Sequence, residues 1–362
     1  MKRTLISSLV ASFICLVCCS QNIDKTDLDA YFDTLARNDK FMGSVAVFKN
    51  KQLIYSKYVG FADIEHGIKA NENTKYRIAS ISKTFTAVLI LKAVDDNKLN
   101  MNQTIDKFFP TIINADKITI SHLLYHRSGI HNFPDDIWLD WNTQFKTEQE
   151  MIEIIAKSGS DFEPDSKASY SNINFILLSH ILEKIYEKPY SKILEEQIIK
   201  PIGLKNTYYG GKINTNNNEC NSYKFLERFF GNSNTGIGHW KIEAETDMSL
   251  LLGCAGIVST PIDLNLFSEA LFNAKLVSTN SLIQMKTIKD SFGMGLFQMP
   301  FNDKTSFGHP GGMDGFVSMF AYFPDSYISF AITANGMNCN VNDIASAVLS
   351  AVYEKPFEIP KF

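Results

Sequence analysis

The chain has 362 residues, of which 45% are hydrophobic and 20% charged, a composition that is ordinary for a globular protein. A chain of this length can hold one large core or two fused lobes. The net charge is -4 and the isoelectric point lies near 6.0. Because no basic stripe accompanies this charge, nucleic acid is disfavoured as a partner.

The N-terminus has the pattern of a targeting segment. Lys2 and Arg3 precede a short apolar stretch from Leu5 to Val17, which is too short to span a bilayer. The following L-V-C-C-S resembles a bacterial lipoprotein signal, with Cys19 as the lipid-modified residue and Cys18 as the alternative. An ordinary cleaved secretory signal is the other interpretation. Either way we expect an exported protein, periplasmic or at the cell surface on a lipid anchor, or else secreted in soluble form.

The remaining chain is expected to be one folded unit. We predict that residues 1–19 are the signal peptide and that residues 20–362 form a single domain. No other apolar run is long enough to span a membrane. Cys220, Cys254 and Cys339 are far apart and lack metal-ligand spacing, so buried thiols are the default and one disulfide is possible.

Strand signals cluster at the two ends of the chain. Residues 43–62 predict two strands joined at Lys49–Lys51, where Asn50 suits a tight turn. After Phe292, four short aromatic and β-branched runs predict further strands. Amphipathic patterns at residues 25–38 and 341–353 predict a first and a last helix.

The middle of the chain reads as helices and loops. Capping signals predict helix starts at Ser121, at Thr147 with Glu150, and at Thr260 before Pro261. The predicted helices cover residues 80–95, 121–129, 147–158, 174–187, 190–199 and 261–272, with Pro201 ending the fifth. Residues 213–247 are rich in Asn and Gly, and they read as a partly irregular insertion.

These elements predict an α+β fold. Its antiparallel β-sheet is flanked by the N- and C-terminal helices, and a mostly helical lobe is inserted at roughly residues 95–250. A cleft is expected between the sheet and the lobe, with the Ser80 helix in its floor.

Ser80 and Lys83 form the only S-x-x-K in the chain. Residues three apart share one face of a helix, where the free N–H groups of the first turn also lie. A serine hydroxyl needs a base and its oxyanion needs donors; Lys83 can serve as that base if burial disfavours its ammonium form. Alternatively, Ser80 is only a helix cap and Lys83 a solvated lysine.

Two further motifs fit the predicted cleft. Tyr170-Ser171-Asn172 is the only Y-x-N, and a phenolate beside a lysine ammonium can exchange protons with a serine. His309-Pro310-Gly311-Gly312 is the only H-x-G, and its glycines let a strand approach a ligand closely, with an N–H as oxyanion donor. The structural alternatives are a buried Tyr with a capping Asn, and a turn with a surface His.

The order of S-x-x-K, Y-x-N and H-x-G resembles the serine β-lactamase and penicillin-binding-protein superfamily, in its class C-like branch. The resemblance covers about Phe41 to Asn335. It includes further blocks in family order: L-L-Y-H-R-S-G-I, F-E-P-D-S-K-A-S-Y-S-N, P-I-G-L-K-N-T-Y-Y, G-C-A-G-I-V-S-T-P-I-D-L and G-H-P-G-G-M-D-G-F.

The resemblance implies a role for each motif residue. Ser80 would be the acylated nucleophile, and Lys83 with Tyr170 would transfer protons in acylation and deacylation. Asn172 would orient these two groups, and the N–H groups of Ser80 and Gly312 would form the oxyanion hole. His309 and Gly311 would be supporting residues of the third motif. No cofactor and no metal is implied.

His309 departs from the pattern, because β-lactamases and carboxypeptidases of the superfamily mostly carry lysine there. A mostly neutral imidazole with a pKa of about 6.5 attracts a substrate carboxylate less than an ammonium does. The sequence therefore favours an esterase or a D-amino-acid peptidase. A class C-type β-lactamase or D-Ala-D-Ala carboxypeptidase is the alternative, and an inactive binding member of the fold is another.

Other residues carry weaker signals. His122 and His126 are expected to pack at a helix end rather than to act in catalysis. Trp138 and Trp141 could line the mouth of the cleft or simply pack their own loop. Asp263 is expected to support the helix cap at Thr260.

Overall fold

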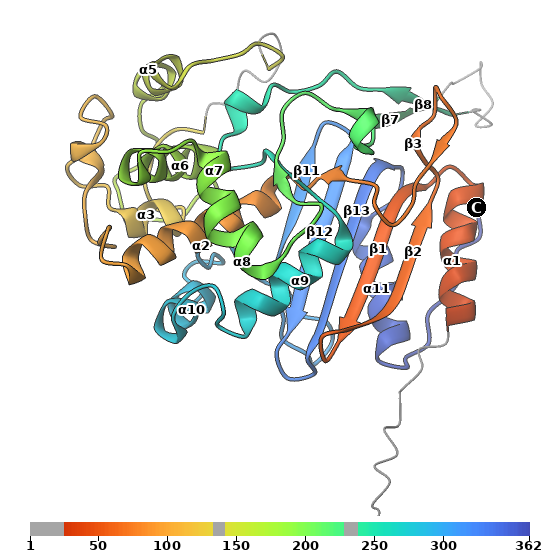
Figure 1. Ribbon diagram of the computed structural model, residues 1–362. Coiled ribbons are helices and arrows are strands. Elements are labelled where there is room, and N and C mark those ends of the chain that lie inside the picture. The colour runs from red at the N-terminus through yellow and green to blue at the C-terminus, as the bar shows by residue number, and fades with distance from the viewer. Residues whose placement is uncertain (1–24, 133–141, 228–237) are drawn as a thin grey trace, which may run out of the picture.

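The computed structural model describes residues 25–132, 142–227 and 238–362 (Figure 1). Its centre is a six-stranded antiparallel sheet in the order β10-β11-β12-β13-β1-β2. In chain order these strands are β1 (Phe41–Lys49), β2 (Gln52–Val59), β10 (Phe297–Gln298), β11 (Phe307–Met313), β12 (Phe316–Phe323) and β13 (Ile328–Met337). The predicted strands at both ends of the chain thus form one sheet, and the predicted fold class is confirmed.

Inside the sheet, the first strand of the chain, β1, lies beside the last described strand, β13. β1 pairs with β13 from Phe41 opposite Met337 to Lys49 opposite Ile328. β1 and β2 are joined at Asn50 and Lys51, which both have positive φ, as a tight hairpin turn requires. The hairpin predicted there is therefore present.

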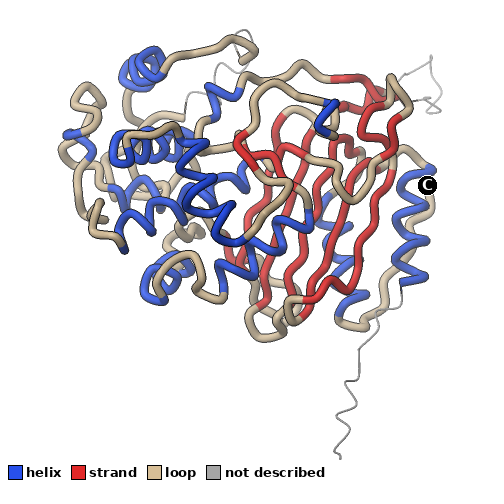
Figure 2. The backbone as a smooth tube through the Cα atoms, in the orientation of Figure 1, coloured by secondary structure: helices blue, strands red, loops and turns tan. Residues whose placement is uncertain are grey.

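Both faces of the sheet are buried. Helices α1 (Lys25–Arg37) and α11 (Val341–Val352) pack with one face, and α9 (Pro261–Phe272) packs against the other (Figures 1 and 2). Neighbouring residues of β12 point to opposite sides of the sheet. Met319 packs in the core on the side of α1 and α11, whereas Phe320 contacts Phe267 of α9. This two-sided burial explains why the C-terminal strands read as apolar runs rather than alternating ones.

The helical lobe lies on the β11 side of the sheet, away from β2 (Figure 1). It contains α2 (Ser82–Asp95), α3 (Ile120–Leu124), α5 (Glu148–Ser158), α6 (Asn172–Tyr186), α7 (Tyr190–Leu194), α8 (Lys200–Ile202) and α10 (Thr279–Lys286). Helix α2 is buried along almost its whole length, which matches its continuous apolar sequence. Within the described part of the chain, no helix is long and apolar enough to cross a membrane.

Several predicted helix boundaries are wrong, among them the end of α3, which lies at Leu124 rather than Gly129. Thr119, not Ser121, caps α3, because its hydroxyl accepts the N–H of His122 while its own backbone is extended. Helix α6 begins at Asn172 rather than Asn174. Pro201 does not end its helix, because a π-helical segment at Glu195–Ile199 leads into α8, and the chain turns only at Gly203 with φ 70°.

Other local predictions are confirmed or need completing. Thr147 and Thr260 cap their helices as expected. The insertion at residues 213–247 is less irregular than predicted, since β7 (Tyr223–Leu226) and β8 (His239–Ile242) form a hairpin within it. A short sheet of β5 (Tyr76–Arg77), β9 (Ile257–Ser259) and β6 (Tyr208–Tyr209) leads the chain into the Ser80 region. The described cysteines Cys220, Cys254 and Cys339 are free thiols.

Candidate active site

Ser80 lies in a tight turn rather than at the first residue of α2. A 3₁₀ turn at Ala79–Ile81 connects β5 to α2, which begins at Ser82. Ala79 has φ 47°, a left-handed conformation that non-glycine residues rarely adopt. Such strain persists only where the surroundings hold it, and it clusters at functional sites. The backbone of this turn thus fixes the position of Ser80.

Lys83 is fully buried beneath Ser80. Its Nζ donates to Ser80 Oγ at 3.0 Å, to Asn172 Oδ1 at 2.7 Å and to the Cys254 carbonyl at 3.0 Å. An ammonium has three N–H donors, so all three have acceptors here. None of these acceptors is a carboxylate, and the lysine charge is therefore not neutralised by a contacting ion partner.

Tyr170 reaches the same place from the loop before α6. The Lys83 Nζ lies 4.9 Å from the centre of its ring. Its ring also lies 4.6 Å from that of His126 and 6.3 Å from that of Phe297, measured between centroids. Because Asn172 is the first residue of α6, the helix start carries both Tyr170 and the amide that holds Lys83. The structure thus brings the first two predicted motifs together.

His309 lies in the middle of β11 and only 1% of it is exposed. Its Nδ1 is 2.5 Å from the Pro310 carbonyl, which can only accept, so the proton of the neutral ring is on Nδ1. Burial and the nearby Lys83 charge lower the pKa of His309 to about 3. The expectation of an imidazole that titrates near pH 6.5 is therefore wrong, because the side chain is removed from water.

Gly311 is required by close packing. A Cβ at this position would lie 2.5 Å from the Ile78 carbonyl and 2.4 Å from Ser318 Oγ. Ser318, directly opposite on β12, donates to the Ile78 carbonyl at 2.8 Å and so ties the sheet to the nucleophile turn. We did not predict Ser318 as a site residue; its only sequence signal is its register opposite Gly311. A Cβ at Gly312 would meet nothing within 4 Å.

These residues surround one cleft of about 320 Å³. It is lined by Ser80, Tyr170, Phe297, His309, Pro310, Gly311 and Gly312. None of these seven residues is a lysine, arginine, aspartate or glutamate, and the pKa of the one histidine among them, His309, is lowered to about 3. The cleft thus combines a hydroxyl, a buried lysine below it and a wall that offers no cationic side chain. It can perform nucleophilic chemistry on an acyl group without pairing a substrate carboxylate with a lining cation.

The Beta-lactamase family model matches residues 28–353. The chain belongs to the Beta-lactamase family. It is a serine hydrolase of this family, as the order of the three motifs predicts. Among curated relatives, the teichoic acid D-alanine hydrolase of Staphylococcus aureus (strain MRSA252) is 26% identical over 313 residues, which cover 84% of this chain and 74% of the relative.

Solved structures share the fold of this Beta-lactamase family member. The D-amino acid amidase from Ochrobactrum anthropi SV3, complexed with L-phenylalanine amide, has a TM-score of 0.77 and 24% identity, covering 90% of this chain and 97% of the amidase. The penicillin binding protein from Bacillus halodurans has a TM-score of 0.75 and 20% identity, covering 88% and 98%. The D-stereospecific amidohydrolase from Streptomyces sp. has a TM-score of 0.74 and 23% identity, covering 88% and 97%.

Two of the weaker candidates of this hydrolase, His122 and Asp263, have structural roles. His122 completes the cap of α3 with Thr119. The Asp263 carboxylate accepts from the Asn206 N–H and the Thr207 hydroxyl, so it supports the region around the Thr260 cap. Trp138 and Trp141 lie outside the described residues. His126 is 2% exposed and packs against Tyr170, which gives it a part beyond that of a helix end.

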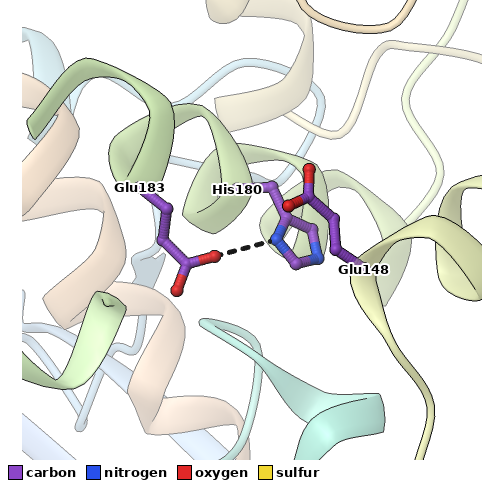
Figure 3. A group of neighbouring side chains, drawn as sticks. All are labelled: Glu148, His180 and Glu183. Carbon is purple, nitrogen blue, oxygen red and sulfur yellow. Dashed lines mark hydrogen bonds and ion pairs between the residues drawn. The ribbon is translucent and has the colours of Figure 1, made fainter. Parts of the chain in front are cut away.

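One other group of side chains in this family member has the composition of a metal site. One potential ligand atom from each of Glu148, His180 and Glu183 lies within 4.8 Å of the others (Figure 3). His180 Nδ1 is 3.0 Å from Glu183, which also accepts the Tyr190 N–H. The Lys184 ammonium lies 2.7 Å from Glu148. Both carboxylates thus already have hydrogen-bond or ion-pair partners, and the Lys184–Glu148 pair joins α6 to α5.

Proposed function

We propose that the protein cleaves an ester or amide bond of a D-amino acid derivative through an acyl-enzyme on Ser80. The observation that carries this proposal is the 3.0 Å contact from Lys83 Nζ to Ser80 Oγ in a cleft whose lining offers no cationic side chain. The names of the relatives support the substrate class, since they describe a D-alanine hydrolase, a D-amino acid amidase and a D-stereospecific amidohydrolase.

The proposed reaction has two halves. Ser80 Oγ attacks the acyl carbon and passes its proton through Lys83 and Tyr170 to the leaving alcohol or amine, whose bond to carbon breaks. Water then attacks the acyl-enzyme, gives its proton to the same pair, and Ser80 leaves with a proton. Asn172 orients Lys83 through its amide oxygen. The N–H groups of Ser80 and Gly312 are the proposed oxyanion donors.

The state of His309 favours substrates without a carboxylate. A β-lactamase or a D-Ala-D-Ala carboxypeptidase must hold a substrate carboxylate, and a cation is the natural partner for it. Here the side chain at that position stays neutral over the pH range of ordinary assays, because burial and Lys83 lower its pKa to about 3. These two activities therefore remain the second candidates. An inactive binding protein is disfavoured by the intact hydrogen bonds of Lys83.

For location, we propose an exported lipoprotein with residues 1–19 as its signal peptide and Cys19 or Cys18 as the anchored residue. This proposal rests on the sequence pattern alone, since residues 1–24 lie outside the described part of the chain. Residues 20–362 are proposed as one hydrolase domain, and its helical lobe, predicted at roughly 95–250, also includes α2 and α10. The membrane would then be a partner only through the lipid.

The nucleophile is tested with a fluorophosphonate and with D- and L-alanine p-nitroanilides. We expect mass spectrometry to find the adduct on Ser80, and Ser80→Ala to lose both the adduct and the hydrolysis of the D-substrate. Ser82→Ala is the matched control, because Ser82 stands two residues away and its hydroxyl accepts the Ile257 N–H. An adduct retained in Ser80→Ala, or an equal rate on both enantiomers, would sink the respective half of the proposal.

The substrate class is tested with His309→Lys on a neutral p-nitrophenyl ester and on a carboxylate-bearing β-lactam. We expect the variant to lower ester turnover and to leave β-lactam hydrolysis negligible. In the wild type, β-lactam turnover should not rise as the pH falls from 8 to 5.5, since His309 does not gain charge there. Far-UV circular dichroism checks that the variant is folded. A wild-type preference for the β-lactam would reverse the order of the two candidates.

A further inference from the structure

His126 makes contacts on both sides of Tyr170. Its carbonyl accepts the Ser169 N–H at 2.9 Å, and its Nδ1 accepts the Ser171 N–H at 3.0 Å. The two residues that flank Tyr170 in sequence are thus bound to one and the same residue. Since backbone hydrogen bonds fix the direction of the intervening Cα–Cβ bond, this pair of bonds sets where the phenol points.

The ring of His126 supports the phenol from beside it. The two ring centroids lie 4.6 Å apart with an interplanar angle of 30°, a separation typical of offset aromatic pairs. Phe292 and Phe175 enclose the imidazole at 5.0 and 5.3 Å, so the ring itself has little freedom. On the catalytic side, Tyr170 meets the Lys83 ammonium at 4.9 Å. The Tyr170 ring thus has the imidazole and the ammonium as immediate neighbours.

The backbone of His126 is unusual in the same place. Its φ is 58°, a left-handed conformation at a residue that is only 2% exposed. Asn, Asp and His tolerate this region better than most residues, and a strained conformation persists only when its surroundings fix it. The conformation lets one residue present both a carbonyl and a ring nitrogen to the 169–171 segment.

We infer that His126 is the positioning residue of Tyr170: by gripping the backbone on both sides and stacking on the ring, it holds the phenol over Lys83. This inference rests on the proposed function, in which Tyr170 transfers protons. His126 does not itself line the cleft, and it contacts the lining residue Tyr170, so it acts through Tyr170. The grip requires a neutral imidazole, because a protonated Nδ1 would face the Ser171 N–H as a second donor.

Burial, with smaller contributions from Lys83 and His309, keeps the pKa of His126 well below its ordinary value. The remaining polar neighbour is the Asn174 amide, whose Nδ2 lies 3.5 Å from Nδ1 and whose Oδ1 accepts from Ser128. The hydrogen-bonded arrangement is therefore expected to persist across the pH range in which esters are assayed.

Three variants separate the hydrogen bond of His126 to the backbone from the contact of its ring with Tyr170. His126→Asn keeps an acceptor near the Nδ1 position and tolerates the left-handed backbone, but it loses the ring. His126→Phe keeps the ring and loses the acceptor. His126→Ala loses both. His122→Asn, four residues earlier on the α3 cap, is the matched control and should retain full activity.

We expect His126→Ala to lower kcat about 10- to 100-fold with KM changed less than about threefold, because misplacing a catalytic group costs rate rather than binding. Asn and Phe should each recover part of the loss. In a Tyr170→Phe background, His126→Asn should change kcat less than about twofold, since there is no hydroxyl left to position.

A loss that adds fully to that of Tyr170→Phe would overturn the inference, as would a change confined to KM. Thermal unfolding measured for each variant identifies a loss caused by poor folding, and His126→Asn keeps the test open if His126→Ala does not fold. If Tyr170→Phe alone retains wild-type kcat, it is the proposed function that fails, and the two failures are thereby told apart.

Discussion

Two buried cations stand on either side of Ser80, and they are held in opposite ways. Arg77 of β5 contacts the carboxylate of Glu245, and its Nη1 lies 4.0 Å from Asp314. Lys83 of α2 is equally buried, yet its three contacts are a hydroxyl, an amide oxygen and a backbone carbonyl. The first cation has carboxylate partners, whereas the second, beside the nucleophile, contacts none.

The difference separates a structural cation from a functional one. Burying a charge without an opposite charge costs several kcal/mol, so a fold gains nothing in stability from an arrangement like that of Lys83. Arg77 ties β5 to the turn after β11 and to the end of the 213–247 insertion, through Asp314 and Glu245. Its contacts fix the distance between the Ser80 turn and β11.

The largest effect is expected when the functional pair is removed. Lys83→Ala and Tyr170→Phe should each lower kcat on a neutral ester by about 10²- to 10⁴-fold, the usual contribution of a general acid or base. The double variant should lose little more than either single one, because the two groups share one proton path. Full additivity in stopped-flow or steady-state rates would contradict a shared path.

The structural cation should behave in the reverse way. Arg77→Met leaves the carboxylates of Asp314 and Glu245 without their cation, and we expect a loss of about 3 kcal/mol in the free energy of unfolding. Lys83→Met removes a buried charge that has no contacting carboxylate, so its stability should stay within about 1 kcal/mol of the wild type. Urea denaturation measures both, and equal losses would erase the distinction.

Acid should destabilise the protein through its buried neutral histidines. The pKa of His309 falls to about 3 on folding from about 6.5 unfolded, so below pH 6.5 the unfolded chain binds a proton that the folded chain does not. Stability is then lost as the pH falls from 6.5 towards 3, by about 2 kcal/mol at pH 5 for this residue.

His309→Gln should flatten that pH dependence of the unfolding free energy, whereas His239→Gln, at an exposed position of β8, should leave it unchanged. A wild-type curve that is flat between pH 7 and 5 would contradict the buried neutral state of both His309 and His126.

The smallest effect is expected from chelation. EDTA should leave ester hydrolysis unchanged, since Lys83 already contacts the Ser80 hydroxyl and the carboxylates of the Glu148 group are already hydrogen-bonded or ion-paired. Rates with and without EDTA, followed by addition of Zn²⁺, provide the measurement. A loss that zinc restores would give that group, or another, a part in catalysis.

Much of the fold was predictable because its signals are local. The capping hydroxyls of Thr147 and Thr260 indicate where their helices begin, and Asn50 indicates the turn of the first hairpin. The errors arise where a neighbour in space decides the outcome. Helix α10 and the β7–β8 hairpin were not predicted, since neither carries a strong periodic pattern. The predicted helix end at Pro201 is wrong because the preceding π-helical segment changes the hydrogen bonding that a proline would otherwise break.

The site divides in the same way. Ser80, Lys83, Tyr170 and His309 can be located by motif, and the structure brings them to one cleft. The neutrality of His309 could not be read from H-P-G-G, because burial by other elements and the Lys83 charge determine it. The contacts of His126 with the segment around Tyr170 join residues far apart in sequence, since its hydrogen bond to Ser171 spans 45 residues. No pattern within either segment predicts these contacts.

The placement of β1 between β2 and β13 also bears on how the chain reaches its folded state. β13 begins at Ile328, so the partner of β1 is made long after β1 itself, and until then the β1–β2 hairpin has an unpaired inner edge. Contacts so distant in sequence slow folding, and open strand edges invite association with other chains. We expect that a chain threaded through a membrane N-terminus first depends on holding factors until β13 emerges, and that truncation before β13 yields aggregates rather than a smaller hydrolase.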